Sequence, residues 1–393
     1  MDIKRSYESR GVSPHKTDVK LALRNVYKGL VPEAFCKIMP DIFSSSDDYC
    51  FLLHADGAGT KSALAYLHYQ RHGDPAIFRG IAHDSLVMNL DDLLCVGATG
   101  SFVFSNTIGR NAKLIPTAVL HEIIEGYEQL ISMLANYGIE IISCGGETAD
   151  VGDLVRTVIV DSTLATRMRR DDIIDASKVK PDHEIVGLAS FGQAIYEQSY
   201  NSGIGSNGFT MIRHEVLTGR YKQEFPETFD PSIADLAYTG RFDIDELIPG
   251  TDLRLDQALL SPTRTYAPVM LKILAVHGGR ISAIFHNTGG GQTKCLGFGH
   301  GIRYVKDNLF PLPPVFRFIK DSVGLPMREM ARVFNLGHRM EIVCEPSFTS
   351  EVLEIAKQFG IDAQVVGRVQ PGHERTSLVL FVEGEELEFK PSD

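Results

Sequence analysis

The sequence predicts a mixed α/β fold in two domains, and three observations lead to this prediction. The chain has 393 residues, which is enough for two domains of ordinary size. In both halves, runs rich in β-branched residues alternate with runs of helical periodicity. A charged stretch that contains a proline, residues 167–184, separates the halves, and we place the boundary near its start. The predicted domains are residues 1–168 and 169–393.

The elements of the first half follow from hydrophobic patterning. The clearest is a helix in which eight apolar residues form one stripe, with Gly138 as its terminator. Leucines at helical spacing mark another helix, and apolar runs mark the strands. In order, we predict a strand at 49–54, a turn at 56–61, helices at 62–72, 84–95 and 117–138, and strands at 139–143 and 155–166.

The second half repeats the alternation of strands and helices after a long polar loop. We expect residues 220–253 to be irregular and exposed, and residues 383–393 to form a polar tail. In order, the other predicted elements are a strand at 185–190, a loop at 192–208, helices at 209–217 and 263–278, a strand at 280–286, a strand at 340–345, a helix at 349–360 and a strand at 362–369.

Composition narrows the classes of function. Hydrophobic residues make up 44% of the chain and charged residues 23%, as in ordinary globular proteins. The formal charge of −11 argues against nucleic-acid binding, which needs a basic surface, but leaves small anionic ligands open. We see no signal peptide and no apolar run long enough for a membrane span. The six cysteines form no Cys-x-x-Cys pair, which indicates reduced thiols in a cytoplasmic protein.

Four glycine-rich polar turns are the first candidate site. They are "DGAGTK" at 56–61, "GGET" at 145–148, "GSNG" at 205–208 and "TGGG" at 288–291. Glycine lets backbone N–H groups converge on an anion, and a following helix strengthens the attraction. The first turn matches neither a P-loop, because Thr60 separates Gly59 from Lys61, nor a dinucleotide fingerprint, because Ser62 replaces a glycine. Each turn alone is more often an ordinary turn, but four together favour a phosphate ligand.

Acidic residues near the ends of predicted elements are the second candidate set: Asp56, Asp84, Asp91, Asp92 and Glu147. Carboxylates beside a triphosphate usually hold Mg²⁺, and a cation such as a lysine offsets the developing charge. The alternatives are an exposed pair on a helix for the two adjacent aspartates and a cap or turn residue for Asp84.

Two further side chains are candidates. His286 ends a strand beside a glycine turn, where an acid, a base or a phosphate contact fits, although a lone histidine is more often structural. Arg264 either faces an anion or forms a surface salt bridge.

Taken in order, the motifs resemble those of the aminoimidazole ribonucleotide synthetase family of purine biosynthesis. The resemblance covers most of the chain. Besides the interdomain stretch at 171–190, the matching segments are "SYESRGV" at 6–12, "DGAGTK", "NLDDLLCVGA", "GGETAD", "SNGF", "LLSPTRTY", "AIFHNTGGG" and "FNLGHRM". Any one of them is weak, but the ordered set is specific.

The resemblance implies two α/β domains, with the amino-terminal domains pairing into a dimeric β-barrel. It also implies that ATP, with Mg²⁺, phosphorylates the amide oxygen of formylglycinamidine ribonucleotide, after which a ring nitrogen attacks and phosphate leaves. The expected catalytic residues are Lys61, Asp92 and His286. The expected ATP site comprises Asp56, Gly57, Gly59, Thr60, Lys61, Gly145, Gly146, Glu147 and Thr148. The expected substrate site comprises Ser206, Asn207, Gly208, Arg264, Thr288, Gly289, Gly290 and Gly291, and the expected metal ligands are Asp56, Asp84, Asp92 and Glu147.

The chain departs from the family pattern around the expected substrate site. The family has a histidine directly before Ser-Asn-Gly, where this chain has Gly205, and about ten extra residues precede that motif. The family's asparagine before the motif aspartate is Asp91 here. If the lost histidine takes part in catalysis, His286 is our candidate replacement. Two alternatives therefore stay open: another ATP-dependent enzyme of the superfamily with a different acceptor, and a nucleotide-binding subunit without turnover.

Overall fold

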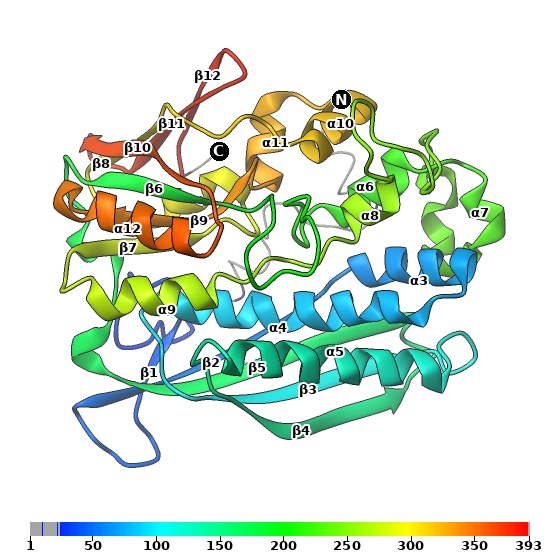
Figure 1. Ribbon diagram of the computed structural model, residues 1–393, viewed down its shortest axis with the longest axis horizontal. Helices are drawn as coiled ribbons and strands as arrows, with labels where there is room; N and C mark the ends of the chain where they lie inside the picture. Colours follow the sequence, from blue (N-terminus) through cyan, green and yellow to red (C-terminus); the bar gives the residue numbers. More distant parts are fainter. Residues whose placement is uncertain (1–9, 11–21, 23, 392–393) are drawn as a thin grey trace.

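The computed structural model describes residue 10, residue 22 and residues 24–391, which form two β-sheets with helices between and around them (Figure 1). Apart from Arg10, the motif at residues 6–12 lies outside the described residues. In the described part of the chain, no helix is both long and apolar enough to cross a membrane.

The first sheet is built from the amino-terminal half. Its strand order is β1-β2-β5-β3-β4, and only the β3–β4 pair is parallel. The strands are β1 (Ile38–Pro40), β2 (Tyr49–Gly57), β3 (Phe102–Arg110), β4 (Ile141–Asp150) and β5 (Val158–Arg169). The helices of this half are α3 (Lys61–His72), α4 (Phe78–Leu94) and α5 (Thr117–Ala135).

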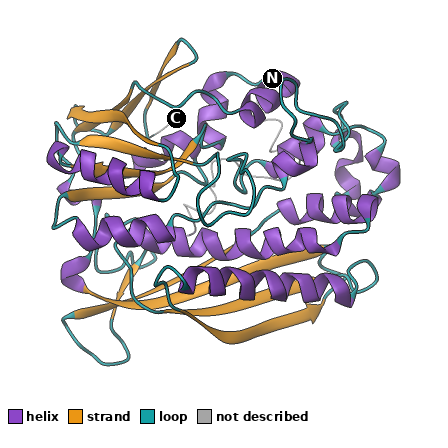
Figure 2. Ribbon diagram, viewed as in Figure 1, coloured by secondary structure: helices purple, strands orange, loops and turns teal. Residues whose placement is uncertain are grey.

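Helices cover one face of the first sheet and leave the other uncovered. Figure 2 shows α4 and α5 lying along the same face of the sheet. Alternate side chains of the strands are buried beneath these helices, as in the run Val158, Val160, Ser162 and Leu164 of β5. On the opposite face the strands expose apolar side chains, namely Leu53, Val103, Ile142 and Ile159. This face lies open in the isolated chain.

The second sheet is built from the carboxyl-terminal half, in the order β12-β11-β8-β10-β6-β9-β7. Its strands are β6 (Glu184–Ala189), β7 (Ile281–His286), β8 (Ile302–Lys306), β9 (His338–Cys344), β10 (Ala363–Pro371), β11 (Ser377–Val382) and β12 (Glu385–Phe389). The helices are α6 (Phe209–Val216), α7 (Tyr221–Glu224), α8 (Leu255–Leu259), α9 (Ala267–Val276), α10 (Pro314–Val323), α11 (Met327–Val333) and α12 (Pro346–Gln358). Helix α9 contacts α4, and this contact joins the two halves (Figure 1).

Most expected elements are confirmed, with the following differences. The "GGET" segment lies within β4 rather than in a turn, and residues 102–110 form the unpredicted strand β3. Residues 385–389 form an edge strand, so the tail is not unstructured. The segment 220–253 is irregular, but it is not all exposed, because its Tyr221 and Tyr238 are fully buried. Strands β8 and β11 and helices α10 and α11 were not predicted.

Candidate active site

Two helices begin side by side at the glycine-rich turns. Helix α3 follows Gly57–Thr60, and α6 follows Gly208, which has a positive φ of 78°. The hydroxyl oxygens of Thr60 and Thr210, in the first turns of the two helices, are 3.2 Å apart. Neither helix carries an acidic residue in its first turn; the N-cap Thr60 of α3 accepts no backbone hydrogen bond through its side chain, and the N-cap of α6 is Gly208, which has no side chain. Two positive helix ends therefore converge on one exposed point, which suits a phosphate.

Two carboxylates lie beside this point. The N–H of Gly57 donates to Asp56 Oδ1 at 2.7 Å, and Gly57 pairs with Asp161 across β2 and β5. A Cβ atom at position 57 would lie 1.8 Å from Asp161 Oδ1, so only glycine fits. Burial, and then the charge of Asp56, raise the pKa of Asp161. A hard divalent cation would relieve this repulsion, so the pair fits Mg²⁺. No motif marks Asp161, because only strand register brings it here.

Lys61 is fully buried, and its donors are already occupied. Its Nζ lies 2.9 Å from Asp84 Oδ2, 3.1 Å from Asp84 Oδ1, 3.1 Å from the Gly205 carbonyl oxygen and 2.7 Å from that of Ser261. Burial lowers the pKa of Lys61 in spite of the opposing charge of Asp84. Asp84 Oδ1 also accepts the backbone N–H of Thr263 at 2.7 Å. In this arrangement Lys61 and Asp84 join the two halves of the chain, and their expected contacts with phosphate and metal stay predictions.

Asp92, His286 and Arg339 form a hydrogen-bonded chain. Arg339 Nε donates to His286 Nε2 at 2.9 Å, so the ring proton is on Nδ1, which donates to Asp92 Oδ1 at 2.6 Å. Burial alone would raise the pKa of Asp92, but the hydrogen bonds from His286 and His54 outweigh it and hold the pKa well below its usual range. Both ring nitrogens of the fully buried His286 are engaged. In this conformation it has no free nitrogen for proton transfer, and its catalytic role stays a prediction.

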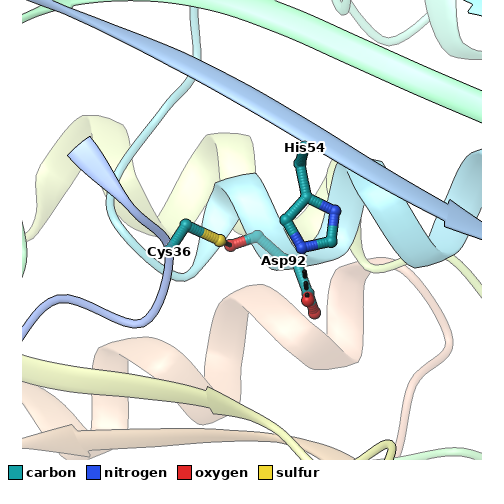
Figure 3. Close-up of side chains that lie close together, drawn as sticks. All are labelled: Cys36, His54 and Asp92. Atoms are coloured by element: carbon teal, nitrogen blue, oxygen red, sulfur yellow. Dashed lines mark hydrogen bonds and ion pairs between the residues drawn. The ribbon is translucent and has the colours of Figure 1, made fainter. Parts of the chain in front are cut away.

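His54, on β2, contacts the other oxygen of Asp92. Its Nε2 is 3.2 Å from Asp92 Oδ2, and its Nδ1 is 2.9 Å from Asn89 Oδ1. Burial would lower the pKa of His54, but Asp92 and Asn89 raise it overall. Cys36 completes the group by donating from its thiol to the carbonyl oxygen of Asp92 at 3.0 Å (Figure 3). No motif marks His54 as a site residue, although it lies two residues before Asp56.

Asp91 and Arg264 are buried rather than surface groups. Asp91 accepts hydrogen bonds from the Thr265 hydroxyl at 2.8 Å and from the Tyr266 backbone N–H. Arg264 binds Glu197 with two donors, at 2.9 and 2.5 Å. Glu197 belongs to the loop 192–208, so this loop already supplies the anion that Arg264 was expected to bind. The proposed surface alternatives, an exposed acidic pair and a surface salt bridge, are both wrong.

The turn Thr288–Gly291 is anchored on both sides by a buried charged cluster. Lys306 Nζ lies 2.5 Å from Glu341 Oε1 and 2.9 Å from the Gln292 carbonyl oxygen. Asn287 Nδ2 donates to the same Glu341 oxygen at 2.9 Å, and His338 Nε2 lies 2.8 Å from it. Within the turn, Gly290 and Gly291 have positive φ angles. The cluster thus fixes the backbone of the expected substrate turn.

The remaining expected residues divide between two places. Ser206 lies beside Thr263, with their hydroxyl oxygens 3.0 Å apart, in the same turn as Asn207 and Gly208. In contrast, Gly145–Thr148 lie on the edge strand β4. Glu147 is exposed and pairs with Thr107, which in turn pairs with Asp161. The structure does not bring Glu147 next to Lys61 or Asp92.

Arg339 occupies the space next to the missing histidine. A Cβ atom at position 205 would lie 3.9 Å from both Cδ and Nη1 of Arg339. Arg339 Nη2 donates to the Arg264 carbonyl oxygen, whereas its buried Nη1 has no hydrogen-bond partner in the described part of the chain. Arg339 lies within the motif "FNLGHRM", but its contact with His286 depends on the pairing of β7 with β9, which no motif indicates.

Comparisons with known proteins agree with this architecture. Residues 38–166 match the family described as AIR synthase related protein, N-terminal domain, and residues 180–379 match its C-terminal domain. The phosphoribosylformylglycinamidine cyclo-ligase of Methanocaldococcus jannaschii is 28% identical over 323 residues, which is 82% of this chain and 79% of that protein. The protein of the same name from Bacillus pumilus is 27% identical over 324 residues, which is 81% of this chain and 79% of that protein.

Solved structures show the same fold at low identity. The structure titled T. maritima PurL complexed with FGAR superposes with a TM-score of 0.55 at 15% identity, over 99% of this chain. This chain spans only 52% of that PurL chain. A chain of the HypE–HypF complex superposes with a TM-score of 0.54 at 12% identity, over 95% of this chain and 99% of that one. At these identities the likeness concerns the fold alone.

Proposed function

This chain belongs to the AIR synthase related protein family, and from that premise we propose that it is an ATP-dependent cyclo-ligase of purine biosynthesis. The relatives that cover about four fifths of the chain are named for this activity. ATP phosphorylates the amide oxygen of formylglycinamidine ribonucleotide, which turns a poor leaving group into a good one. A ring nitrogen then attacks the same carbon, phosphate leaves and aminoimidazole ribonucleotide forms.

The observation that carries the ATP part of the proposal is the convergence of the α3 and α6 amino termini at Thr60 and Thr210. Backbone N–H groups at two helix ends suit the phosphates, and the backbone of Gly57–Thr60 forms the adjoining loop. Asp56 and Asp161 would hold Mg²⁺, which supplies charge neutralisation on the transferring phosphoryl group when bound. We infer that the phosphate loop and the two helix ends are held in place by the buried polar groups packed against them, namely Lys61, Asp84, Asp92 and His286.

The direct test is an assay with ATP, Mg²⁺ and formylglycinamidine ribonucleotide that reads ADP release and aminoimidazole formation together. We expect both products in equal amounts, because one phosphorylation drives each ring closure. Release of ADP without aminoimidazole would support the proposed ATP site but contradict formylglycinamidine ribonucleotide as the substrate. The absence of both products from folded, ATP-binding protein would favour a non-catalytic nucleotide-binding subunit.

One observation favours a second candidate, an ATP-dependent enzyme of the same family with a different acceptor. Glu197 from the loop 192–208 neutralises Arg264, and Gly205 replaces the histidine of the family pattern. Both changes lie at the acceptor side of the site, where they alter the charge offered to a substrate. Glu197→Gln separates the two candidates: a cyclo-ligase that needs Arg264 free gains affinity for the ribonucleotide, whereas an enzyme for another acceptor does not.

We also propose that two copies pair through the uncovered face of the first sheet, as the family resemblance implies. Leu53, Val103, Ile142 and Ile159 expose apolar surface on four neighbouring strands there. Burying such a face against a second copy is favourable at roughly 25 cal/mol per Å² of apolar area. The domain limits 1–168 and 169–393, and a cytoplasmic location, remain predictions of the sequence.

The pairing is tested by placing charge on this face. We expect Leu53→Lys combined with Ile142→Lys to convert a dimer into a monomer in light scattering, because two lysines would be desolvated at the interface. Phe381→Lys is the matched control, since Phe381 is also exposed on a strand but belongs to the second sheet. A dimer that survives the double substitution would contradict the proposed face.

A further inference from the structure

Three potential metal ligands from three separate segments meet beside the candidate site (Figure 3). Cys36 precedes β1, His54 is on β2 and Asp92 is on α4. One side-chain ligand atom of each residue lies within 4.8 Å of those of the other two. The chain thus brings a sulfur, a nitrogen and an oxygen ligand atom to one point. The pair formed by Asp56 and Asp161, in contrast, offers only carboxylate oxygens.

The orientation of His54 follows from its hydrogen bonds. Asn89 Nδ2 donates to three backbone carbonyl oxygens, those of Asp56, Ser85 and Ser162. Asn89 Oδ1 therefore accepts from His54 Nδ1, at 2.9 Å, and the proton of a neutral ring sits on Nδ1. In a ring that carries only this proton, His54 Nε2 directs a lone pair at Asp92 Oδ2, 3.2 Å away; in the hydrogen bond described above, a second proton lies between these two atoms. Two acceptors at this distance need a cation, and either a proton or a metal ion can serve.

The surroundings of Asp92 are those of a metal ligand with outer-sphere support. His286 Nδ1 donates to Asp92 Oδ1 at 2.6 Å, which fixes the carboxylate and leaves Oδ2 for another partner. His54 is held in the same way by Asn89 through its second nitrogen. Such outer partners orient the ligands and fix the histidine tautomer in metal sites.

We propose that Cys36, His54 and Asp92 bind one zinc ion, with water as the fourth ligand. Zinc bonds of about 2.0–2.3 Å in a tetrahedron place ligand atoms about 3.3–3.7 Å apart, and the separation of His54 Nε2 and Asp92 Oδ2 is close to this. The thiol turns from the Asp92 carbonyl oxygen to the ion. One thiolate and one carboxylate balance the charge of the ion. The side chains of His54 and Asp92 are 23% and 13% exposed, which leaves room for water.

The ligand types separate this site from the others in the described chain. A thiolate is a soft ligand that favours zinc and disfavours Mg²⁺. A second group, His68, His72 and Asp256, has no sulfur, and Arg254 already neutralises its carboxylate with two donors, at 3.0 and 2.6 Å. The zinc proposal does not depend on the proposed reaction, because it rests on ligands that are tested without substrate.

The test is a titration of the metal-stripped full chain with Co²⁺, in the presence of excess Mg²⁺. We expect saturation at one equivalent, with the visible bands of tetrahedral Co²⁺ and a thiolate-to-cobalt charge-transfer band in the near ultraviolet. Added Zn²⁺ should bleach both. Cys36→Ser and Cys36→Ala should lose the charge-transfer band, and His54→Ala should weaken binding by at least about tenfold.

Matched controls exclude other sources of the signal. Cys50→Ser removes a buried thiol from the same strand as His54, and His68→Ala disrupts the second ligand group, so both should leave the band unchanged. The proposal is overturned if the folded chain shows no charge-transfer band, because a proton then fills the position between His54 and Asp92. It is equally overturned if the band survives in both Cys36 variants, which would indicate the exposed Cys144, or if Mg²⁺ abolishes it.

Discussion

Lys61→Ala is expected to lower the free energy of unfolding by about 3–5 kcal/mol, because it leaves the fully buried Asp84 carboxylate without its counterion. The loss includes the contacts of Lys61 Nζ with the carbonyl oxygens of Gly205 and Ser261. These contacts tie α3 to the turn that precedes α6 and to the segment between α8 and α9. We therefore expect ATP turnover and stability to fall together, as measured by urea unfolding and by ADP release.

This measurement distinguishes a structural role of Lys61, as the partner of Asp84 that joins the two halves, from a role in binding phosphate. A lysine that only binds phosphate would lose turnover without a change in the unfolding midpoint, and this outcome would contradict the buried ion pair. The double variant Lys61→Met, Asp84→Leu should recover part of the stability without recovering turnover, because it removes both buried charges. Lys113→Ala is the control: this lysine is exposed, and the change should be smaller than about 0.5 kcal/mol.

The local pattern of apolar residues was enough to predict those helices and strands that show a clear hydrophobic periodicity or an apolar run. The apolar stripe of residues 117–138 became α5, and the run 49–54 became the start of β2. Strands that are stabilised mainly by pairing with adjacent strands were not predicted. Strand β12 reads as a polar tail because it is an edge strand paired only with β11. The "GGET" segment reads as a turn because glycines weaken strands, yet pairing with β3 holds it extended.

The candidate site was predictable in residue type but not in pairing. The sequence singled out Asp84, Asp92 and His286 as metal or catalytic candidates, and the structure buries all three in polar networks; their roles stay predictions. It could not show that Asp92 meets a histidine 194 positions away, or that Asp161 faces Gly57 across two strands. Such contacts depend on long-range packing, which no short motif encodes. For the same reason, no motif indicated that Lys61 is buried against Asp84.

The buried cluster beneath the turn Thr288–Gly291 makes the second large prediction. Glu341→Gln keeps the size of the side chain but leaves Lys306 buried without a counterion. We expect a loss of about 3–5 kcal/mol in the free energy of unfolding near pH 7. Asn287, which precedes the turn, loses its charged acceptor, and Lys306, which binds Gln292 at the other end of the turn, loses its counterion. The substrate turn should loosen, so KM for the acceptor should rise more than KM for ATP.

The loss should depend on pH in a defined direction. Burial alone would raise the pKa of Glu341, but Lys306 and His338 outweigh it and lower the pKa to about 2. The unfolded value is about 4.3, so the carboxylate stabilises the fold fully above that pH and loses its effect as the pH falls toward 2. The stability gap between the native chain and Glu341→Gln should therefore be constant near neutral pH and close between about pH 4.3 and 2. Glu386→Gln, an exposed carboxylate on β12, is the control and should show no such gap. A gap that persists unchanged at pH 2 would mean that the charge of Glu341 does not stabilise the cluster, and that its shape alone does.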